Sequence, residues 1–448
     1  MWLYQNSRVG VLTLLLFAVY ALPFIHVIPY LWFDFDATPP PVMWGLAVNP
    51  YMTDKSVIEL MSMIGAVGAT GFVFGALLGR VRRPTGMENN ESISWGNTTK
   101  TLSLPVFLVW IVVSIALTWV SAPKETIFTA AYTQSEPINI NWGFSAAWMV
   151  SYAVLTFALA DAMFEFRPGI GKLKRTVIML TILLVVIWFQ LLRGDRESLT
   201  FVVAAALMYY AWGRSIRGVV SGRRGLSGSK IFLVAVMVFA AAFFVGSLRS
   251  MLAGTSTISE LSNNLEQIGK SGALPFDNMM AGTWSGVLLT PLSIAGDYIN
   301  GSLAIQYGKT YLDLVGSIIP GFLADWIGYE RPIDAFHGPA WEMTYGIGGT
   351  HAVVVPFLDF RMAGVFLIMA IWSYLFAKSE QIAIRRLTVA NITLLGIVAM
   401  ATPHWMWYGE KYIMNALILW IVLSVLYRIR MTKTEIRPDT VRPSPGSF

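Results

Sequence analysis

The sequence predicts an all-α fold: a polytopic integral membrane protein with about ten membrane-spanning helices and one large extracytoplasmic loop. Of its 448 residues, 55% are hydrophobic and 13% are charged, a composition too apolar for an ordinary soluble domain. Apolar runs of about 20 residues recur from end to end, and each can cross a hydrocarbon layer about 30 Å thick. Because backbone polar groups in lipid need partners within their own segment, these runs are expected to be helices.

Ten candidate spans follow one another along the chain. They lie near residues 9–31, 56–79, 103–121, 143–166, 176–192, 199–213, 231–248, 362–377, 388–403 and 412–427. The first run is longer than the apolar part of a secretory signal peptide, which has about 7–15 residues. We therefore expect it to be retained as a helix.

The charges of the loops orient these spans. Basic residues concentrate in alternate connections and in the C-terminal tail, so that 22 of the 32 lysine and arginine residues fall on one side. Positive charge is typical of cytoplasmic loops. Both termini are therefore expected in the cytoplasm, and the other set of loops on the outer face.

This assignment divides the chain into four parts. They are an N-terminal transmembrane bundle of about seven helices (1–248), a large outer loop (249–361), C-terminal transmembrane helices (362–428) and a disordered cytoplasmic tail (429–448). The outer loop is too aromatic and apolar for disorder, and loops of this length are usually functional. Its segments 282–299 and 310–328 are amphipathic, and we expect them to lie on the membrane interface or to re-enter it, as part of a cap over a cavity.

Composition also excludes several kinds of site. The chain has no cysteine, so disulfides, thiolate nucleophiles and cysteine-ligated metals are excluded. No histidine pair or carboxylate cluster has the spacing of metal ligands, and no metal or other cofactor is expected. The net charge of +6 lies in short loops between apolar runs, which argues for membrane topology and against nucleic-acid binding.

Two outer arginines, Arg193 and Arg196, precede a short span. As a helix, the run 199–213 is only about 22 Å long, so the charged turn is drawn towards the membrane. Arginine there needs a protein cavity or an anionic head group, and its planar guanidinium suits diphosphate oxygens. The alternative is an ion pair with Asp195 or Glu197 that closes a tight turn.

Arg249 follows the run 231–248 on the outer side, where positive charge is otherwise scarce. It is a second candidate for contact with an anionic ligand. The alternative is an anchor that extends its charged group to the membrane surface.

Candidate acid–base residues gather at the end of the outer loop: His337, Glu342 and His351. Deprotonating a hydroxyl requires a carboxylate or imidazole within hydrogen-bond reach, with a pKa near neutrality. The sequence does not choose among the three, and each could instead be a solvated or aromatic-packed polar residue. Arg331 and Arg361, in the same stretch, are further candidates for binding a diphosphate.

Other polar residues carry weaker signals. Asp34 and Asp36, just after the first span, resemble the acidic site of lipid-phosphate-sugar transferases of the C fold class, or form a solvated turn. His26 lies inside an aliphatic run and is expected to be a core residue. His404, beside Trp405, is typical of an aromatic belt at the membrane interface.

Three features then occur in the order typical of one family. They are G-x-R-x-x-L at residues 194–199, Arg249 ahead of the outer loop, and YGKTYLDLVGSIIP at residues 307–320. Together with a glycine-rich stretch at 346–349, they resemble the Wzy-type polymerases of O-antigen and other bacterial surface polysaccharides. Members often carry an acid at the start of the next helix. In this chain the corresponding stretch, HAVVVPFLDFRMAG (351–364), has no acid at that position, so His351 or Asp359 would take its place.

The resemblance implies a GT-C-like transferase architecture in the bacterial inner membrane, with the site facing the periplasm. It implies an inverting, metal-independent glycosyltransferase that moves a growing glycan from undecaprenyl diphosphate to the non-reducing end of another lipid-linked repeat unit. Arginines would hold the diphosphate, a base would activate the acceptor hydroxyl, and a chain-length-regulating co-polymerase would be a partner. Two alternatives remain: an O-antigen ligase or other lipid-linked-sugar glycosyltransferase, and a lipid-linked oligosaccharide flippase or transporter.

Overall fold

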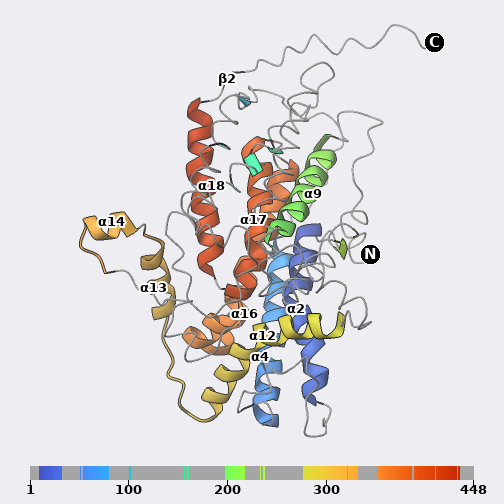
Figure 1. Cartoon of the computed structure of the whole chain (residues 1–448), viewed down its shortest axis with the longest axis vertical. Helices are drawn as coiled ribbons and strands as arrows, with labels where there is room; N and C mark the ends of the chain where they lie inside the picture. Colours follow the sequence, from blue (N-terminus) through green and yellow to red (C-terminus); the bar gives the residue numbers. More distant parts are fainter. Residues whose placement is uncertain are drawn as a thin grey trace, which may run out of the picture.

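Helices form nearly all of the chain that the computed structural model describes (Figure 1). The described residues are 10–32, 51, 54–79, 100–101, 112, 153, 156–157, 159–160, 197–216, 233, 236–237, 276–319, 321–330, 351–385, 388–408, 410–430 and 432–433. In chain order the helices are α2 (Val11–Trp32), α4 (Lys55–Leu78), α9 (Glu197–Ile216), α12 (Phe276–Ile299), α13 (Lys309–Ile318), α14 (Gly321–Trp326), α16 (Val354–Arg385), α17 (Val389–Tyr408) and α18 (Glu410–Arg430). One short antiparallel pairing joins β1 (Lys100–Thr101) to β2 (Thr432–Lys433). The all-α prediction is confirmed for these residues.

The ten predicted spans are only partly tested. Six of them overlap α2, α4, α9, α16, α17 and α18, although α9, with 20 residues, is longer than the short span predicted at 199–213, and α16 has 32 residues. The runs 103–121, 143–166, 176–192 and 231–248 lie mostly outside the described residues. By length and composition, two helices in the described part of the chain could cross a membrane, Lys55–Leu78 and Val354–Ile384. Five others contain shorter apolar stretches. The number of spans therefore stays a prediction.

Helices α4 and α16 run parallel and closely packed. α4 begins at Asp54, whose carboxylate accepts a hydrogen bond from the Ser56 amide at 2.9 Å, as helix N-caps do. Further along, Gly71 and Gly75 face the backbone carbonyl groups of Phe366 and Ala370, with no room for a side chain. Small residues four apart let helix backbones approach closely, which is typical of helix pairs in membranes.

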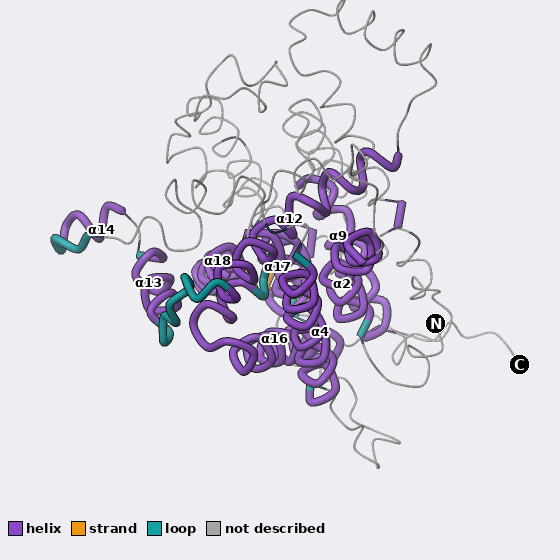
Figure 2. Tube along the Cα trace, turned by 90° about the horizontal axis from the view of Figure 1, so that it is seen from below, coloured by secondary structure: helices purple, strands orange, loops and turns teal. Residues whose placement is uncertain are grey.

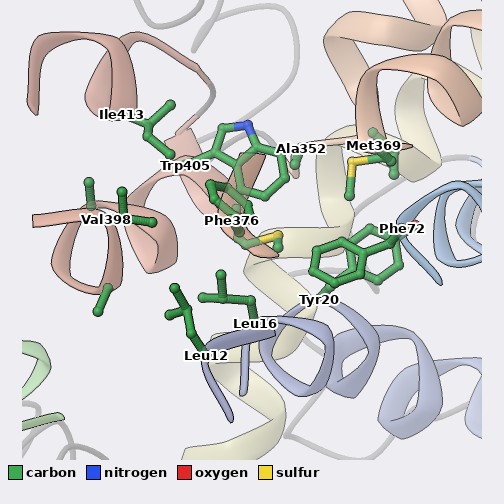
Figure 3. Close-up of a cluster of buried hydrophobic side chains, with 14 of the residues drawn as sticks. Leu12, Leu16, Tyr20, Phe72, Ala352, Met369, Phe376, Val398, Trp405 and Ile413 are labelled. Carbon is green, nitrogen blue, oxygen red and sulfur yellow. The ribbon is translucent and has the colours of Figure 1, made fainter. Parts of the chain in front are cut away.

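Helix α2 packs against this pair in the opposite direction to α4. The Tyr20 hydroxyl donates to the Gly65 carbonyl at 2.8 Å, and the rings of Phe17 and Phe72 lie 5.7 Å apart. Figure 3 shows the buried cluster that joins α2 and α4 to α16, α17 and α18, with Trp405 next to Phe376. This cluster is the main core of the described residues.

Two sets of contacts mark the opposite ends of α4. At its last residues, the Gln381 side chain donates to the Gly79 carbonyl, and the Glu380 carboxylate accepts from the first α2 amides, at 2.9 Å from Val11. Before its first residue, the Tyr51 hydroxyl donates to Asp297 at 2.9 Å. α12 therefore reaches the end of the bundle where α4 begins.

The two amphipathic segments of the outer loop fold as helices, with different bounds from those predicted. Segment 282–299 belongs to α12, which crosses the bundle in Figure 1 and buries residues such as Leu288 and Leu292 against α2 and α4. Segment 310–328 forms two helices, α13 and α14, because Pro320 restricts the preceding Ile319 to an extended backbone (φ −59°, ψ 123°). The boundary predicted at residue 361 falls inside α16, which begins at Val354.

Candidate functional site

A buried carboxylate holds the beginning of α13 against α16. Asp359 is completely buried and accepts hydrogen bonds from the Thr310 hydroxyl at 2.8 Å and from the Tyr311 amide at 3.2 Å. The N-cap residue of α13 is Gly308, whose φ of 84° suits glycine and which has no side chain to cap the helix. Asp359 therefore supplies the cap, and a negative charge is favourable at that end of a helix.

The same tyrosine reaches a second buried carboxylate. The Tyr311 hydroxyl donates to Glu410 Oε1 at 2.8 Å, and Glu410 is the first residue of α18. Burial raises the pKa of Glu410 to about 7, and the charge on Asp359 adds to this. Burial and the two carboxylates raise the pKa of Tyr311 well above its ordinary value, so it remains a neutral donor.

The indole of Trp405 lies beside Glu410. Glu410 Oε2 and the indole nitrogen are both buried without a hydrogen bond of full geometry, but the indole still acts on the carboxylate and lowers its pKa, against the larger effect of burial. An unpaired buried polar atom costs free energy and is uncommon in folded proteins. A buried carboxylate with a pKa near neutrality can exchange a proton with a bound group at physiological pH.

Arg361 lies two residues after Asp359, at a kink in α16. Its backbone (φ 56°, ψ −148°) is in the region of the left-handed conformations that favours glycine, and such strain is concentrated at functional sites. Its guanidinium packs over the rings of Tyr298 and Phe357, at 4.8 and 5.4 Å from their centres, and Nη2 donates to the Leu303 carbonyl at 2.9 Å. Nη1 is buried without a partner, so one donor is available for an anionic oxygen.

These contacts bring four helices together around the kink. Arg361 reaches the connection after α12, and the Gln306 amide donates to the Leu358 carbonyl at 3.1 Å in the same connection. Asp359 holds α13, and Tyr311 continues to Glu410 on α18. We define Asp359, Tyr311, Glu410 and Arg361 as the candidate site.

His351, a predicted base, lies in the aromatic core next to this site. Its ring stands edge-on to Tyr20 and Phe24, with centroids 5.1 and 4.9 Å away, and Nδ1 accepts from the Val353 amide at 3.4 Å. Burial lowers the pKa of His351 to about 4, which keeps the ring neutral at physiological pH. This environment favours the aromatic-packed alternative for His351.

Of the other predicted site residues, the structure describes only Arg361. His337, Glu342, Arg193, Arg196, Arg249 and Arg331 lie outside the residues whose side chains are described. Within the candidate site, Arg361 lies two residues after Asp359, which the sequence offered as a replacement for the acid missing from the family pattern. The roles of the other six stay predictions.

Sequence reasoning missed Glu410 and Tyr311. One signal for Glu410 was present: it is the only acidic residue between Arg386 and Arg430. Tyr311 lies inside the YGKTYLDLVGSIIP motif, but no local pattern shows that its hydroxyl meets a residue 99 positions later.

The chain matches no protein-family profile, no curated protein and no solved structure. Within the described residues, no group of three or more histidine, aspartate or glutamate side chains could hold a metal ion. The described groups of the candidate site are two carboxylates, a tyrosine hydroxyl and a guanidinium.

Proposed function

We propose that the chain is a polytopic membrane glycosyltransferase that polymerises a bacterial surface polysaccharide. It would act at the periplasmic face of the inner membrane, with both termini in the cytoplasm. The donor would be a glycan on undecaprenyl diphosphate, and the acceptor the non-reducing end of another lipid-linked repeat unit. The sequence motifs described above support this assignment, and so does the chemistry of the candidate site.

One observation carries the proposal: Glu410, a buried carboxylate with a pKa of about 7, is linked through Tyr311 and Asp359 to the segment that bears Arg361. A transferase of this kind needs a base for a hydroxyl and a cation for a diphosphate. Glu410 and Arg361 are the described residues that suit these two roles.

The proposed reaction is a single displacement. Glu410 accepts the proton of the acceptor hydroxyl, whose oxygen forms a bond to the anomeric carbon of the donor sugar. The bond from that carbon to the diphosphate oxygen breaks, and undecaprenyl diphosphate leaves with the bonding electron pair. Arg361 stabilises the charge that develops on the leaving group, a role shared with the predicted Arg193, Arg196 and Arg249.

The outer surface of the described helices is consistent with a lipid environment. Large apolar side chains are exposed along α4, α16 and α18, among them Phe74, Leu367, Ile371, Ile421 and Val422. Extended exposed apolar surfaces are typical of contact with membrane or protein. Lipid contact along these three helices would explain why apolar side chains of the described residues are exposed there.

Complementation tests the proposal. A strain that lacks its polysaccharide polymerase makes single-repeat products, and the wild-type chain should restore a ladder of long glycans. Glu410→Gln and Arg361→Lys should leave single-repeat products while the protein still inserts, and Glu59→Gln, at an exposed position of α4, should restore the ladder. A normal ladder from Glu410→Gln would remove Glu410 from the mechanism.

A transporter or flippase of lipid-linked oligosaccharide is the second candidate. The observation that favours it is again Glu410, because buried acids that titrate near neutral pH are used in proton-coupled transport. The two functions predict that different intermediates accumulate when the protein is inactive in the same strain. Loss of a flippase leaves lipid-linked units on the cytoplasmic face, whereas loss of a polymerase leaves them exported and short.

A further inference from the structure

The segment of α13 and α14, residues 307–329, carries an apolar face that no described side chain covers. We call it the α13–α14 arm. On α14, Leu323, Trp326 and Ile327 are spaced so that they share one helix face, and Trp326 is 83% exposed. On α13, Leu312 is 73% exposed and Val315 59%. Large apolar side chains exposed at this spacing indicate a surface that has a partner.

The arm stands beside the bundle. In Figure 1, α14 lies at the height of the lower half of α18, and Figure 2, seen from below, places both helices on one side of the bundle. A segment that extended past the bundle along its axis would be surrounded by water. A segment beside the helices is at the depth of the bilayer if those helices span it.

We propose that the apolar face of the arm lies in membrane lipid, beside the start of α18. This inference rests on the proposed membrane function. Lipid fits better than a protein partner, because the face combines aliphatic side chains with exposed Trp326 and Tyr307, and tryptophan and tyrosine are typical of the membrane interface. α18, which α13 contacts, exposes apolar side chains as well, Ile418 and Ile421 among them.

Charge agrees with this orientation. Asp325 is exposed and lies on α14 away from the face formed by Leu323, Trp326 and Ile327, whereas Lys309, at the first turn of α13, lies at the edge of the face that carries Leu312. A helix that lies in the interface places its apolar side in lipid and its charged side towards water. The arm has the residues for both sides.

The arm begins at the candidate site. Thr310 and Tyr311, at the start of α13, bind Asp359 and Glu410. Lipid chains that contact the apolar face of α13 would therefore be separated from the proposed base, Glu410, only by that helix. The ligand class that this arrangement suits is a long-chain lipid such as the polyprenyl chain of the donor, held in the bilayer while its head group reaches Glu410 and Arg361.

Single-cysteine labelling tests the inference directly, because the chain has no native cysteine. Trp326→Cys, Asp325→Cys and Ile421→Cys would each carry a nitroxide spin label in proteoliposomes of neutral phospholipid. The accessibility of each label to oxygen, which enters lipid, would be compared with its accessibility to a water-soluble nickel chelate. Labels at 326 and 421 should favour oxygen several-fold, and the label at 325 should favour nickel.

Each result has a distinct meaning. If the label at 326 is more accessible to nickel while the label at 421 is more accessible to oxygen, the arm does not contact lipid. The proposed function is not affected by that result. A label at 326 that is protected from both reagents also overturns the arm's lipid contact, and indicates a protein partner. If 421 favours nickel too, the membrane placement on which both proposals rest is wrong.

Activity gives a second readout. Trp326→Asp would place a charge on the apolar face, and it should shorten the glycan ladder several-fold, whereas Trp326→Phe should preserve it. A full-length ladder from Trp326→Asp would contradict a role for this face in presenting the lipid donor. The labelling result does not depend on enzymatic activity, so the two proposals can fail separately.

Discussion

At the scale of single residues, two side chains lie in environments that ordinary packing does not require. Glu410 is a buried acid whose pKa is raised to about 7, and Arg361 is a side-chain-bearing residue in a backbone conformation that glycine prefers. Removing either feature would relieve a local cost in the folded state. Their retention is explained if the site binds a ligand that uses both groups.

The pKa of Glu410 predicts a dependence of stability on pH. Because burial raises that pKa from 4.5 to about 7, the folded protein keeps a proton that the unfolded chain loses. The resulting stability is complete below about pH 4.5 and is lost as pH rises through about 7, a change of about 3 kcal/mol. Glutamine mimics the protonated acid. The free energy of unfolding of Glu410→Gln, relative to wild type, should therefore increase by about that amount over this range.

Because His351 also titrates, the free energy of unfolding of Glu410→Gln has to be compared with that of wild type at each pH. The pKa of His351 is lowered to about 4, so its contribution to stability is lost as pH falls from about 6.5 to 4, opposite in sign to that of Glu410. The two contributions overlap in wild type, but His351 is the same in both proteins and cancels from the comparison. A difference that stays constant from pH 4.5 to 8 would show that Glu410 is not a buried acid with a raised pKa.

The backbone at Arg361 makes a second prediction. At an ordinary helical position alanine is more stable than glycine by about 1 kcal/mol. At φ 56° and ψ −148° the order should be reversed, with Arg361→Gly more stable than Arg361→Ala by about 1–2 kcal/mol. Thermal unfolding of the two variants in detergent measures this difference. The usual order, with alanine more stable, would show that the kink does not hold this residue in a strained conformation.

At the scale of elements, much of the helical framework could be predicted from hydropathy alone. α4 begins and ends within one residue of the predicted span 56–79. α16 differs: it begins eight residues before the predicted 362, because its first residues pack in the core although they include the charged Asp359. A span predicted from hydropathy ends at charged residues, even where those residues are buried and hydrogen-bonded. The part of α16 that carries Asp359 and Arg361 was therefore assigned to the loop.

Pairing between distant elements could not be predicted from the sequence. Asp359 and Tyr311 are 48 residues apart, and Tyr311 and Glu410 are 99 apart. No helical period or short motif relates such positions, because their contact depends on how α13, α16 and α18 pack. For this reason the sequence identified an arginine of the site, Arg361, and missed Glu410.

The α4–α16 interface yields a prediction for helix packing. Gly75→Ala would place a methyl group against the Ala370 carbonyl, and because this contact is with backbone, the helices must move apart. We expect a loss of about 1–3 kcal/mol, measured as a lower temperature of thermal unfolding. Val73→Ala, at an exposed position of α4, should change it little. Equal stability of Gly75→Ala and wild type would show that α4 and α16 are not in backbone contact.

At the scale of the whole molecule, the described contacts separate two regions of the bundle. Glu380 and Gln381 join the ends of α16 and α4 to the start of α2, on the side that loop charge assigns to the cytoplasm. Arg361 lies with α12, which reaches the residues before α4, on the side assigned to the outer face. A site at the outer face suits a donor that is made in the cytoplasm and used after export.

The central claim is that the protein transfers glycan between lipid-linked units, and purified protein tests it most directly. Wild-type chain in proteoliposomes would receive undecaprenyl-diphosphate-linked repeat units, without nucleotide, metal or ion gradient. We predict products longer than one repeat, with release of undecaprenyl diphosphate, and no elongation by Glu410→Gln of equal stability. Failure of the wild-type protein to elongate, combined with movement of the lipid-linked units across the bilayer, would contradict the account and identify a transporter.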